Sequence, residues 1–171
     1  MALPDDYRFF LAHIGNGGAG PYYGVFRLGE HDNGGDACKW EDGALVGDVS
    51  KPFAYQDRWN LPASFWAAEP DPPDDMPLEE QDRLEEAWDK RLEAEYWHPQ
   101  LMNGAIPICH LGCALRHWLV VTGPCRGEVW ADHRADFEGL HPLTAEKGDR
   151  LTFERWYCSW LEEALAGFGI A

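Results

Sequence analysis

Residues Gly104 to Gly123 read Gly-Ala-Ile-Pro-Ile-Cys-His-Leu-Gly-Cys-Ala-Leu-Arg-His-Trp-Leu-Val-Val-Thr-Gly. Two runs of β-branched and other large apolar residues, 106–111 and 115–122, meet at Gly112. Such runs, separated by a glycine, are typical of two strands joined by a turn. A segment containing Gly and Pro then leads into Glu128 to Ala131, which is a third β-prone run. The middle of the chain is therefore predicted to fold as an antiparallel meander.

Helical patterns lie on both sides of this meander. From Pro4 to Ile14, apolar residues recur with the spacing i, i+3, i+4 and i+7, which is typical of one face of a helix. From Pro77 to Tyr96 an apolar stripe predicts a surface helix. Thr152 is a candidate N-cap of a third helix, which ends at Gly167 and packs its wide apolar face on the sheet. We therefore expect a single α+β domain over residues 1–171, with a central antiparallel sheet flanked by N-terminal, middle and C-terminal helices.

The segments that join these elements are less regular. Tyr22 to Leu28 has the composition of a short strand, and residues 29–50, rich in Gly, Asp and charged residues, are predicted to form a long loop. Proline and acidic residues dominate Glu69 to Asp75, which predicts a linker without regular structure. Residues Glu69 to Glu95 hold twelve acidic and three basic side chains, a net charge of −9. The negative charge is therefore concentrated in this linker and the helix that follows it.

The charge of the whole chain narrows the classes of partner. Thirty Asp and Glu residues against 14 Lys and Arg residues give a formal net charge of −16. Such a surface repels phosphate backbones and anionic lipid headgroups, so we expect neither a nucleic acid nor a membrane as partner. A basic protein would be attracted to it, and salt would weaken that attraction. The charge therefore favours a basic protein partner.

Two features bear on the cellular compartment. The sequence has no run of about 18 apolar residues that would cross a bilayer, and its first residues lack the basic start and apolar core of a signal peptide. Its five cysteines are odd in number and widely spaced, which is not the pattern of a disulfide framework. We therefore expect a cytoplasmic chain with reduced thiols.

Three blocks of sequence, in the same order, carry a resemblance to a known family. The first is Leu-Pro-Asp-Asp-Tyr-Arg-Phe-Phe-Leu at 3–11, followed by the Gly-rich segment 15–21. The second is Gly104 to Gly123, and the third is 153–161, which begins Phe-Glu-Arg-Trp-Tyr. Together they resemble the SUKH superfamily, whose members include fungal cell-wall-synthesis regulators and many bacterial immunity proteins. The first two blocks are fairly specific when they occur together, and the third is weak alone.

The resemblance implies an α+β domain that binds protein and does not catalyse a reaction. In bacteria the superfamily is chiefly associated with the neutralisation of polymorphic toxins, many of which are nucleases. Members generally carry a further helix before the Leu-Pro element, where this sequence has only Met1 and Ala2, so one edge of the fold is expected to be rebuilt or absent. The acidic region at about 69–96 corresponds to the variable part between the shared blocks.

The resemblance and the charge together predict an immunity-type protein that neutralises a cationic toxin, for example a nuclease, through an acidic surface. A nuclease must be cationic around its active site, so an inhibitor can present carboxylates in place of phosphates. Aromatic residues beside Gly-rich or acidic loops are candidate anchors, because aromatic residues are enriched among binding hot spots. The predicted partner-binding residues are Tyr22, Tyr23, Trp40, Glu41, Asp42, Asp71, Asp74 and Asp75.

One cluster in the meander has the donor atoms of a zinc site: Cys109, His110, Cys113 and His117. Their spacing is uncommon for a structural zinc site, and neighbouring strand residues point to opposite faces, so packed thiols and a hydrogen-bonded histidine are the favoured interpretation. The run 132–136, Asp-His-Arg-Ala-Asp, offers groups for acid–base chemistry but is more typical of surface ion pairs. We therefore assign no metal, no cofactor and no catalytic residue.

Two other interpretations fit the same sequence. One is a regulatory or scaffold module that binds an ordinary cellular protein, as the fungal members of the family suggest. The other is a domain that binds a small ligand or a metal. A toxin encoded beside this protein would favour the immunity interpretation, and stoichiometric zinc in the purified protein would favour the metal-binding one.

Overall fold

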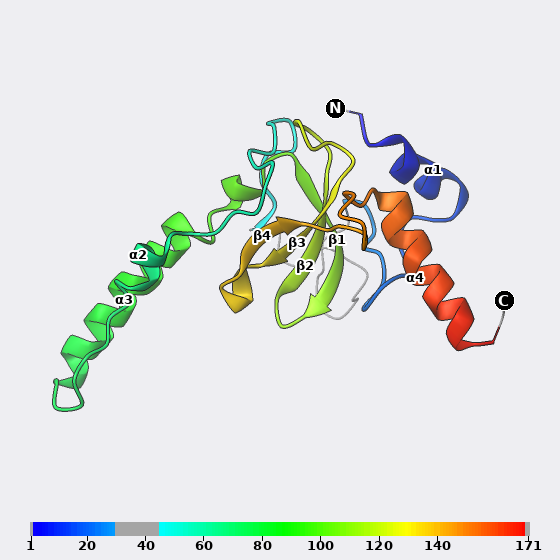
Figure 1. The fold of residues 1–171 in the computed structure, drawn as a ribbon. Coiled ribbons are helices and arrows are strands. Elements are labelled where there is room, and N and C mark those ends of the chain that lie inside the picture. Colours follow the sequence, from blue (N-terminus) through cyan, green and yellow to red (C-terminus); the bar gives the residue numbers. More distant parts are fainter. Residues whose placement is uncertain (1, 30–44, 170–171) are drawn as a thin grey trace.

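The computed structural model describes residues 2–29 and 45–169, and Figure 1 shows how they are arranged. A four-stranded antiparallel sheet lies at the centre, with helices from the N-terminal, middle and C-terminal parts of the chain around it. The predicted α+β architecture is therefore confirmed. The helices and strands follow one another as α1 (Asp5–His13), α2 (Ala63–Trp66), α3 (Leu78–Glu95), β1 (Ala105–Gly112), β2 (Leu115–Val120), β3 (Val129–His133), β4 (Gly139–Pro142) and α4 (Phe153–Gly167), with short 3-10 turns at Pro99–Met102 and Arg134–Asp136.

The sheet is a meander in which the strands lie in the order β1-β2-β3-β4. Ile106 of β1 pairs with Leu119 of β2, and Trp118 of β2 pairs with Trp130 of β3. The predicted meander is confirmed, and β4 is an additional strand. Because β4 has only four residues, begins with glycine and ends with proline, it lacks the β-prone run that identifies the other three strands in the sequence.

Side chains alternate between the two faces of the sheet and bury a hydrophobic core on each. On β2, Leu119 points to the face covered by α1 and α4, whereas Trp118 and Val120 point to the opposite face. The buried residues of the first core are Tyr7, Phe10, Val25, Phe26, Ile106, Ile108, Cys109, Leu119, Val121, Val129, Phe153 and Trp156. Those of the second are Phe53, Met102, Ala105, Trp118, Val120, Cys125, Trp130 and Leu140.

α1 and α4 pack against each other over the first core. The ring of Phe10 meets the rings of Phe153 and Tyr157 edge to face, with centroids 5.1 and 5.0 Å apart. The Thr152 Oγ1 accepts a hydrogen bond from the Arg155 N–H at 3.4 Å, so Thr152 is the predicted N-cap of α4. These contacts bring the two ends of the chain together on one side of the sheet.

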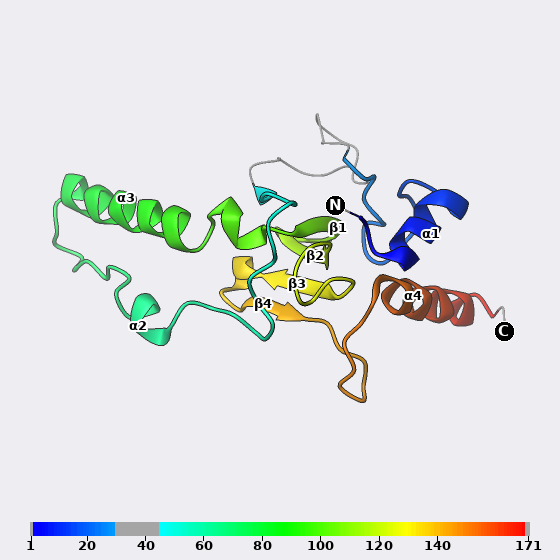
Figure 2. The ribbon, with the colours of Figure 1, turned by 90° about the horizontal axis from the view of Figure 1, so that it is seen from above.

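The prediction that the whole apolar face of α4 packs on the sheet is wrong. Phe153 and Trp156 are buried, but Leu161 and Leu165 are exposed. α1 has 9 residues and α4 has 15, so α1 is about 14 Å long and α4 about 22 Å. The shorter helix cannot cover the last turns of the longer one, and Figure 2 shows the C-terminal half of α4 extending beyond the sheet.

The segment Tyr22 to Leu28 does not form the predicted strand. Val25 makes isolated bridges, one of them with Cys109, and no ladder continues from them among the described residues. Tyr22 and Gly24 have positive φ angles of 51° and 94°, which turn the chain out of an extended path. The segment therefore crosses the edge of β1 as an irregular loop.

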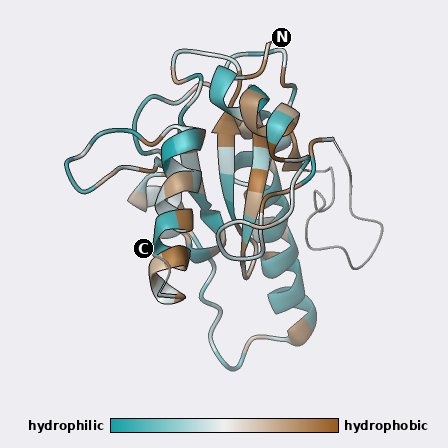
Figure 3. Cartoon of the chain, turned by 90° about the vertical axis from the view of Figure 1, so that its right-hand side faces the viewer, coloured by the Kyte–Doolittle hydropathy of each residue, from teal (hydrophilic) through white to brown (hydrophobic). Residues whose placement is uncertain are grey.

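On the side of the sheet away from α1 and α4, the chain leaves the body as an arm, which we define as residues 63–95 (Figures 1 and 2). The arm consists of α2, α3 and the segment that joins them. Coloured by hydropathy, α3 is almost entirely hydrophilic (Figure 3). Within the described part of the chain, no helix has both the length and the apolar character needed to cross a membrane.

Candidate functional site

α3 presents a dense set of carboxylates to solvent. Glu79 and Glu80 lie in its first turn, where negative charge interacts favourably with the helix dipole. The helix has 18 residues and none of them is buried. Its only half-buried side chains are those of Gln81, Trp88 and Leu92, all on the face toward α2 and the joining segment. The charged side chains are therefore exposed on the remaining faces of the helix.

The end of the arm farthest from the sheet carries three of the predicted partner-binding residues. Asp71, Asp74 and Asp75 lie in the segment between α2 and α3 (Figure 1). All three side chains are exposed, and none of them forms an ion pair with another described residue. The tip of the arm is therefore an unneutralised cluster of negative charge.

Few cations offset the acidic side chains of α3. The Lys90 Nζ lies 3.5 Å from the Glu86 Oε2, and the Arg91 Nε lies 2.9 Å from the Glu95 Oε1. Both pairs are four residues apart along the helix, the spacing at which side chains meet. Six other carboxylates of α3 have no ion-pair partner among the described residues, so the helix keeps a strong negative field.

Aromatic and cationic groups hold α2 against α3. The buried ring of Phe65 lies 5.0 Å from the ring of Trp88, measured between centroids. The Arg91 guanidinium lies 4.3 Å from the Phe65 ring centroid and 5.7 Å from that of Trp88, within the range of cation–π attraction. This cluster gives the arm a small hydrophobic centre of its own.

A second aromatic cluster joins the base of the arm to the sheet. Tyr96, directly after α3, is fully buried, and its ring centroid lies 4.9 Å from that of Trp66 and 5.8 Å from that of Trp59. Trp66 also contacts Phe137, in the turn between β3 and β4, at 5.2 Å between centroids. Both ends of the arm are therefore packed on the same edge of the body.

A buried ion pair fixes the same junction. The Arg134 Nε and Nη2 donate to the two carboxylate oxygens of Asp132 at 2.8 and 2.7 Å, and the Arg134 Nη1 donates to the Tyr96 carbonyl at 2.9 Å. Both charged side chains are buried, and such bidentate pairs have a fixed geometry. The carboxylate of Asp132 is therefore committed to structure, which removes it from the acid–base chemistry that the run 132–136 offers in principle.

Tyr22 and Tyr23 lie exposed over the β1–β2 hairpin. The Tyr22 ring meets His117 edge to face with centroids 5.8 Å apart, and the Tyr23 ring stacks on His110 at 5.5 Å. The φ of 51° at Tyr22 is a left-handed conformation that costs a residue with a side chain about 1–2 kcal/mol. Neighbouring contacts therefore hold a strained aromatic residue at the surface.

The predicted partner-binding residues do not form one surface. Tyr22 and Tyr23 lie over the β1–β2 hairpin, whereas the three aspartates lie in the outer part of the arm, which projects away from the sheet (Figures 1 and 2). The remaining predicted residues lie outside the described part of the chain: Trp40, Glu41 and Asp42. The acidic arm and the tyrosine pair are therefore two separate candidate surfaces.

The residues with zinc-binding donor atoms take part in packing and hydrogen bonds. The Cys109 thiol donates to the Pro21 carbonyl with an S···O distance of 3.2 Å, and the His117 Nδ1 accepts from the Trp156 Nε1–H at 3.1 Å. Cys113 is exposed in the turn between β1 and β2. Within residues 2–29 and 45–169, no group of three or more His, Cys, Asp or Glu residues is placed to hold a metal ion.

Two exposed leucines on the acidic arm are not among the residues predicted from the sequence to bind a partner. Leu78 and Leu84 are exposed on α3 among the carboxylates. Charge steers association, but buried apolar contacts supply most of the affinity of an interface, so these leucines are candidate anchors. Leu78 lies outside the apolar stripe that predicts this helix. An apolar residue off the stripe is expected to be exposed, and this is the signal in the sequence that could have identified Leu78 as a candidate anchor.

Comparison with known proteins identifies no relative. No family model, no curated protein and no solved structure matches this chain. The resemblance to the SUKH superfamily therefore stays a prediction from the three sequence blocks. The charge of the molecule and its exposed surfaces are therefore the observations that indicate what it binds.

Proposed function

We propose that this protein is a non-catalytic immunity-type protein that acts in the cytoplasm and neutralises a cationic protein toxin. The observation that carries the proposal is α3, an 18-residue helix with eight carboxylates and no buried residue, which projects from the sheet on the arm. A projecting anionic helix is suited to enter a cationic cleft of another protein. The resemblance of three sequence blocks to the SUKH superfamily supports the immunity role.

The charge density of α3 supports a nuclease as the target. Eighteen residues at a rise of about 1.5 Å give a helix about 27 Å long, so its eight carboxylates occur about once every 3.4 Å. A strand of DNA carries one phosphate per about 3.4 Å along the helix axis. α3 therefore offers a nuclease an anionic density similar to that of its substrate, without a bond that the nuclease can cleave.

The fixed base of the arm supports an inhibitory role. An inhibitor loses less conformational entropy on binding when its contact groups are already held in place. The Arg134–Asp132 ion pair and the ring of Tyr96 hold the end of α3 on the body, and Phe65 holds its middle against α2. The arm therefore presents its carboxylates as a preorganised set.

The proposal requires the neighbouring gene to encode a basic toxin, and it is tested by the rate at which this protein binds the product of that gene. The variant Glu79→Gln, Asp82→Asn, Glu85→Gln removes three exposed arm carboxylates. Because steering by a charged surface raises association rates by about one to three orders of magnitude, we expect the variant to associate about tenfold more slowly at low salt. At about 0.5 M NaCl the rates converge, because the charges are screened. Stopped-flow fluorescence measures both rates.

The matched control is Glu146→Gln, Asp149→Asn, Glu163→Gln, which removes the same number of exposed carboxylates outside the arm. We expect this control to change the association rate by less than about twofold, because these groups lie far from the arm. Equal slowing by the two triple variants would reject the arm as the binding surface. Binding that leaves the toxin active would reject neutralisation and favour the regulatory interpretation.

A further inference from the structure

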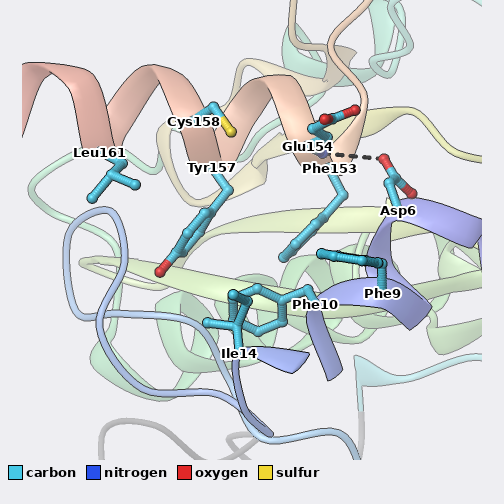
Figure 4. A pocket seen from close by; sticks show the side chains of 9 residues that line it. All are labelled: Asp6, Phe9, Phe10, Ile14, Phe153, Glu154, Tyr157, Cys158 and Leu161. Atoms are coloured by element: carbon cyan, nitrogen blue, oxygen red, sulfur yellow. Dashed lines mark hydrogen bonds between the residues drawn. The ribbon is translucent and has the colours of Figure 1, made fainter. Parts of the chain in front are cut away.

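An apolar pocket of about 510 Å³ lies between α1 and α4, at the opposite end of the molecule from the arm (Figures 1 and 4). The rings of Phe10, Phe153 and Tyr157 form its floor, where the two helices touch. Its full lining is Asp6, Phe9, Phe10, Ile14, Phe153, Glu154, Tyr157, Cys158 and Leu161. The pocket is therefore an apolar groove whose two walls are helices.

The groove continues along α4 as an uncovered ridge. Phe153, Tyr157, Leu161 and Leu165 recur every four residues, so their side chains form one row along the helix. Phe153 is 2% exposed, Leu161 39% and Leu165 38%, so the row emerges from the core as it leaves α1. Phe168, just beyond the helix, is 81% exposed. This row has the geometry of a helix-packing ridge that lacks a partner in the part of the chain described.

α1 adds exposed apolar side chains to the other wall. Phe9 is 60% exposed and Ile14 is 64% exposed, and Figure 4 shows both beside the groove. Neither belongs to the first core, which α1 reaches through Tyr7 and Phe10. Apolar side chains gathered around one concave site are typical of a binding surface rather than of scattered surface residues.

The charged groups of the groove all have one sign. Asp6 and Glu154 line it, and no lysine or arginine does. The Asp6 Oδ2 accepts the Glu154 N–H at 3.1 Å, so that carboxylate is fixed at the start of α4 (Figure 4). Glu162 follows Cys158 by four residues and therefore lies on the same face of α4. The occupant should combine an apolar surface with positive charge.

We propose that this groove binds an amphipathic helix of a partner protein that carries lysine or arginine beside its apolar stripe. A helix fits because the exposed row on α4 is a ridge of the kind that packs into the grooves of another helix. A second copy of this chain is disfavoured, because each copy carries a net charge of −16 and would bring the same carboxylates to the contact. The groove and the arm are separate surfaces, so this inference holds whether or not the arm binds a toxin.

The test uses the intact protein and a synthetic, fluorescein-labelled helical peptide of about 18 residues, with leucine on one face and lysine on the other. One control peptide has the same residues in an order without an apolar face, and another has glutamate in place of lysine. Fluorescence anisotropy measures binding. We expect only the cationic amphipathic peptide to bind at micromolar concentration in about 0.15 M NaCl, where long-range attraction is screened.

The variant Leu161→Gln, Leu165→Gln removes the exposed ridge without touching the core. We expect it to weaken binding of the cationic amphipathic peptide at least tenfold, because truncated hot-spot residues commonly have effects of that size. Leu84→Gln, which removes a leucine of nearly the same exposure on α3, is the matched control and should leave the affinity unchanged. Because Cys158 lines the groove and Cys113 does not, the peptide should slow alkylation of Cys158 but not of Cys113, as measured by mass spectrometry.

Four results would overturn the proposal. Equal binding of the cationic and glutamate peptides would contradict the charge argument. Equal binding of the control peptide whose residue order gives no apolar face would contradict a helix in the groove. Binding that survives Leu161→Gln, Leu165→Gln with no protection of Cys158 would place the peptide elsewhere. A dimer in sedimentation that dissociates in this variant would make a second copy the occupant. The arm variant Glu79→Gln, Asp82→Asn, Glu85→Gln serves as a further control, since it weakens toxin binding but should leave groove binding intact.

Discussion

At the scale of single residues, His117 shows how a potential ligand becomes a structural group. Its Nδ1 accepts the Trp156 indole N–H at 3.1 Å, which joins β2 to α4. Burial, with smaller contributions from the neighbouring His133 and His141, lowers the pKa of His117 to about 3. Protonation of Nδ1 would remove the acceptor for Trp156, so the folded protein requires the neutral ring.

This environment predicts a pH dependence of stability. An unfolded histidine has a pKa of about 6.5, whereas the folded value is about 3. Below pH 6.5 the unfolded state binds a proton that the folded state does not, so the free energy of unfolding decreases by up to about 1.4 kcal/mol per pH unit. The loss begins near pH 6.5 and ends near pH 3, while above pH 6.5 His117 contributes no pH dependence.

The variant His117→Asn isolates this contribution, because an amide oxygen can accept the Trp156 N–H but does not titrate. Urea unfolding at pH 7, 6, 5 and 4 measures the free energy of unfolding of both proteins. We expect the wild type to lose about 1 kcal/mol per pH unit more than the variant between pH 6 and pH 4. If the free energy of unfolding falls equally for both proteins between pH 6 and pH 4, His117 is protonated in the folded state over this range, which contradicts the prediction.

At the scale of elements, α3 depends on a few contacts for its position. An isolated helix of this length is marginally stable in water, so most of its stability has to come from packing. The described contacts that hold it are the Phe65–Trp88–Arg91 cluster and the base at Tyr96. Loss of the first cluster should loosen the arm without unfolding the sheet.

Substitution of Phe65 tests this dependence. Phe65→Ala removes a buried ring whose neighbours are Trp66, Trp88 and Arg91. We expect amide hydrogen exchange in α3 to accelerate at least tenfold, a loss of about 1.4 kcal/mol of local stability, with no change in β1 and β2. Phe168→Ala, which removes an exposed phenylalanine just beyond α4, is the control and should leave α3 unchanged. Faster exchange throughout the sheet would mean that arm and body unfold as one unit.

The two long helices also show what local patterns can predict. The stripe at 77–96 and the apolar face after Thr152 both locate a helix correctly, because helical periodicity is a property of a few neighbouring residues. Neither pattern predicts which other elements will cover the apolar face of the helix, or how much of that face they will cover. Among the described residues, α3 packs on α2 and on the segment that joins them, and the last turns of α4 meet no other element.

At the scale of the whole molecule, the acidic arm and the apolar groove are separated. The arm holds the dense carboxylates, and the groove between α1 and α4 holds exposed apolar side chains. Figure 1 shows the arm and these two helices at opposite ends of the molecule. The sheet and its two cores stand between them. Such a molecule can contact two parts of a large partner, or two partners, without competition between its surfaces.

The net charge also predicts how salt affects stability. A net charge of −16 on one chain repels itself in the compact state, and that repulsion is screened as the Debye length decreases from about 30 Å at 0.01 M to about 8 Å at 0.15 M. We expect the free energy of unfolding to increase by about 1 kcal/mol between 0.01 and 0.2 M NaCl, measured by urea unfolding at pH 7. For the variant Glu79→Gln, Asp82→Asn, Glu85→Gln, the free energy of unfolding should increase less over the same range of NaCl, because the variant carries less negative charge. A decrease in stability with NaCl would show that favourable ion pairs outweigh the repulsion.

The sequence by itself determined the elements with strong local signals. The helices α1, α3 and α4 and the strands β1, β2 and β3 follow from periodicity, β-prone runs, the Thr152 cap and glycine turns, all of which act between residues close in the chain. The concentration of charge at 69–95 could also be counted before any fold was known.

Only the tertiary structure decided which of these features share a surface. It added β4, which depends on pairing with β3 rather than on its own residues, and it placed Tyr22 and Tyr23 over the β1–β2 hairpin. It also left the end of α4 uncovered and so formed the groove. The physical reason is that local preferences follow from neighbours in the chain, whereas burial depends on what other elements, distant in sequence, bring to the same place.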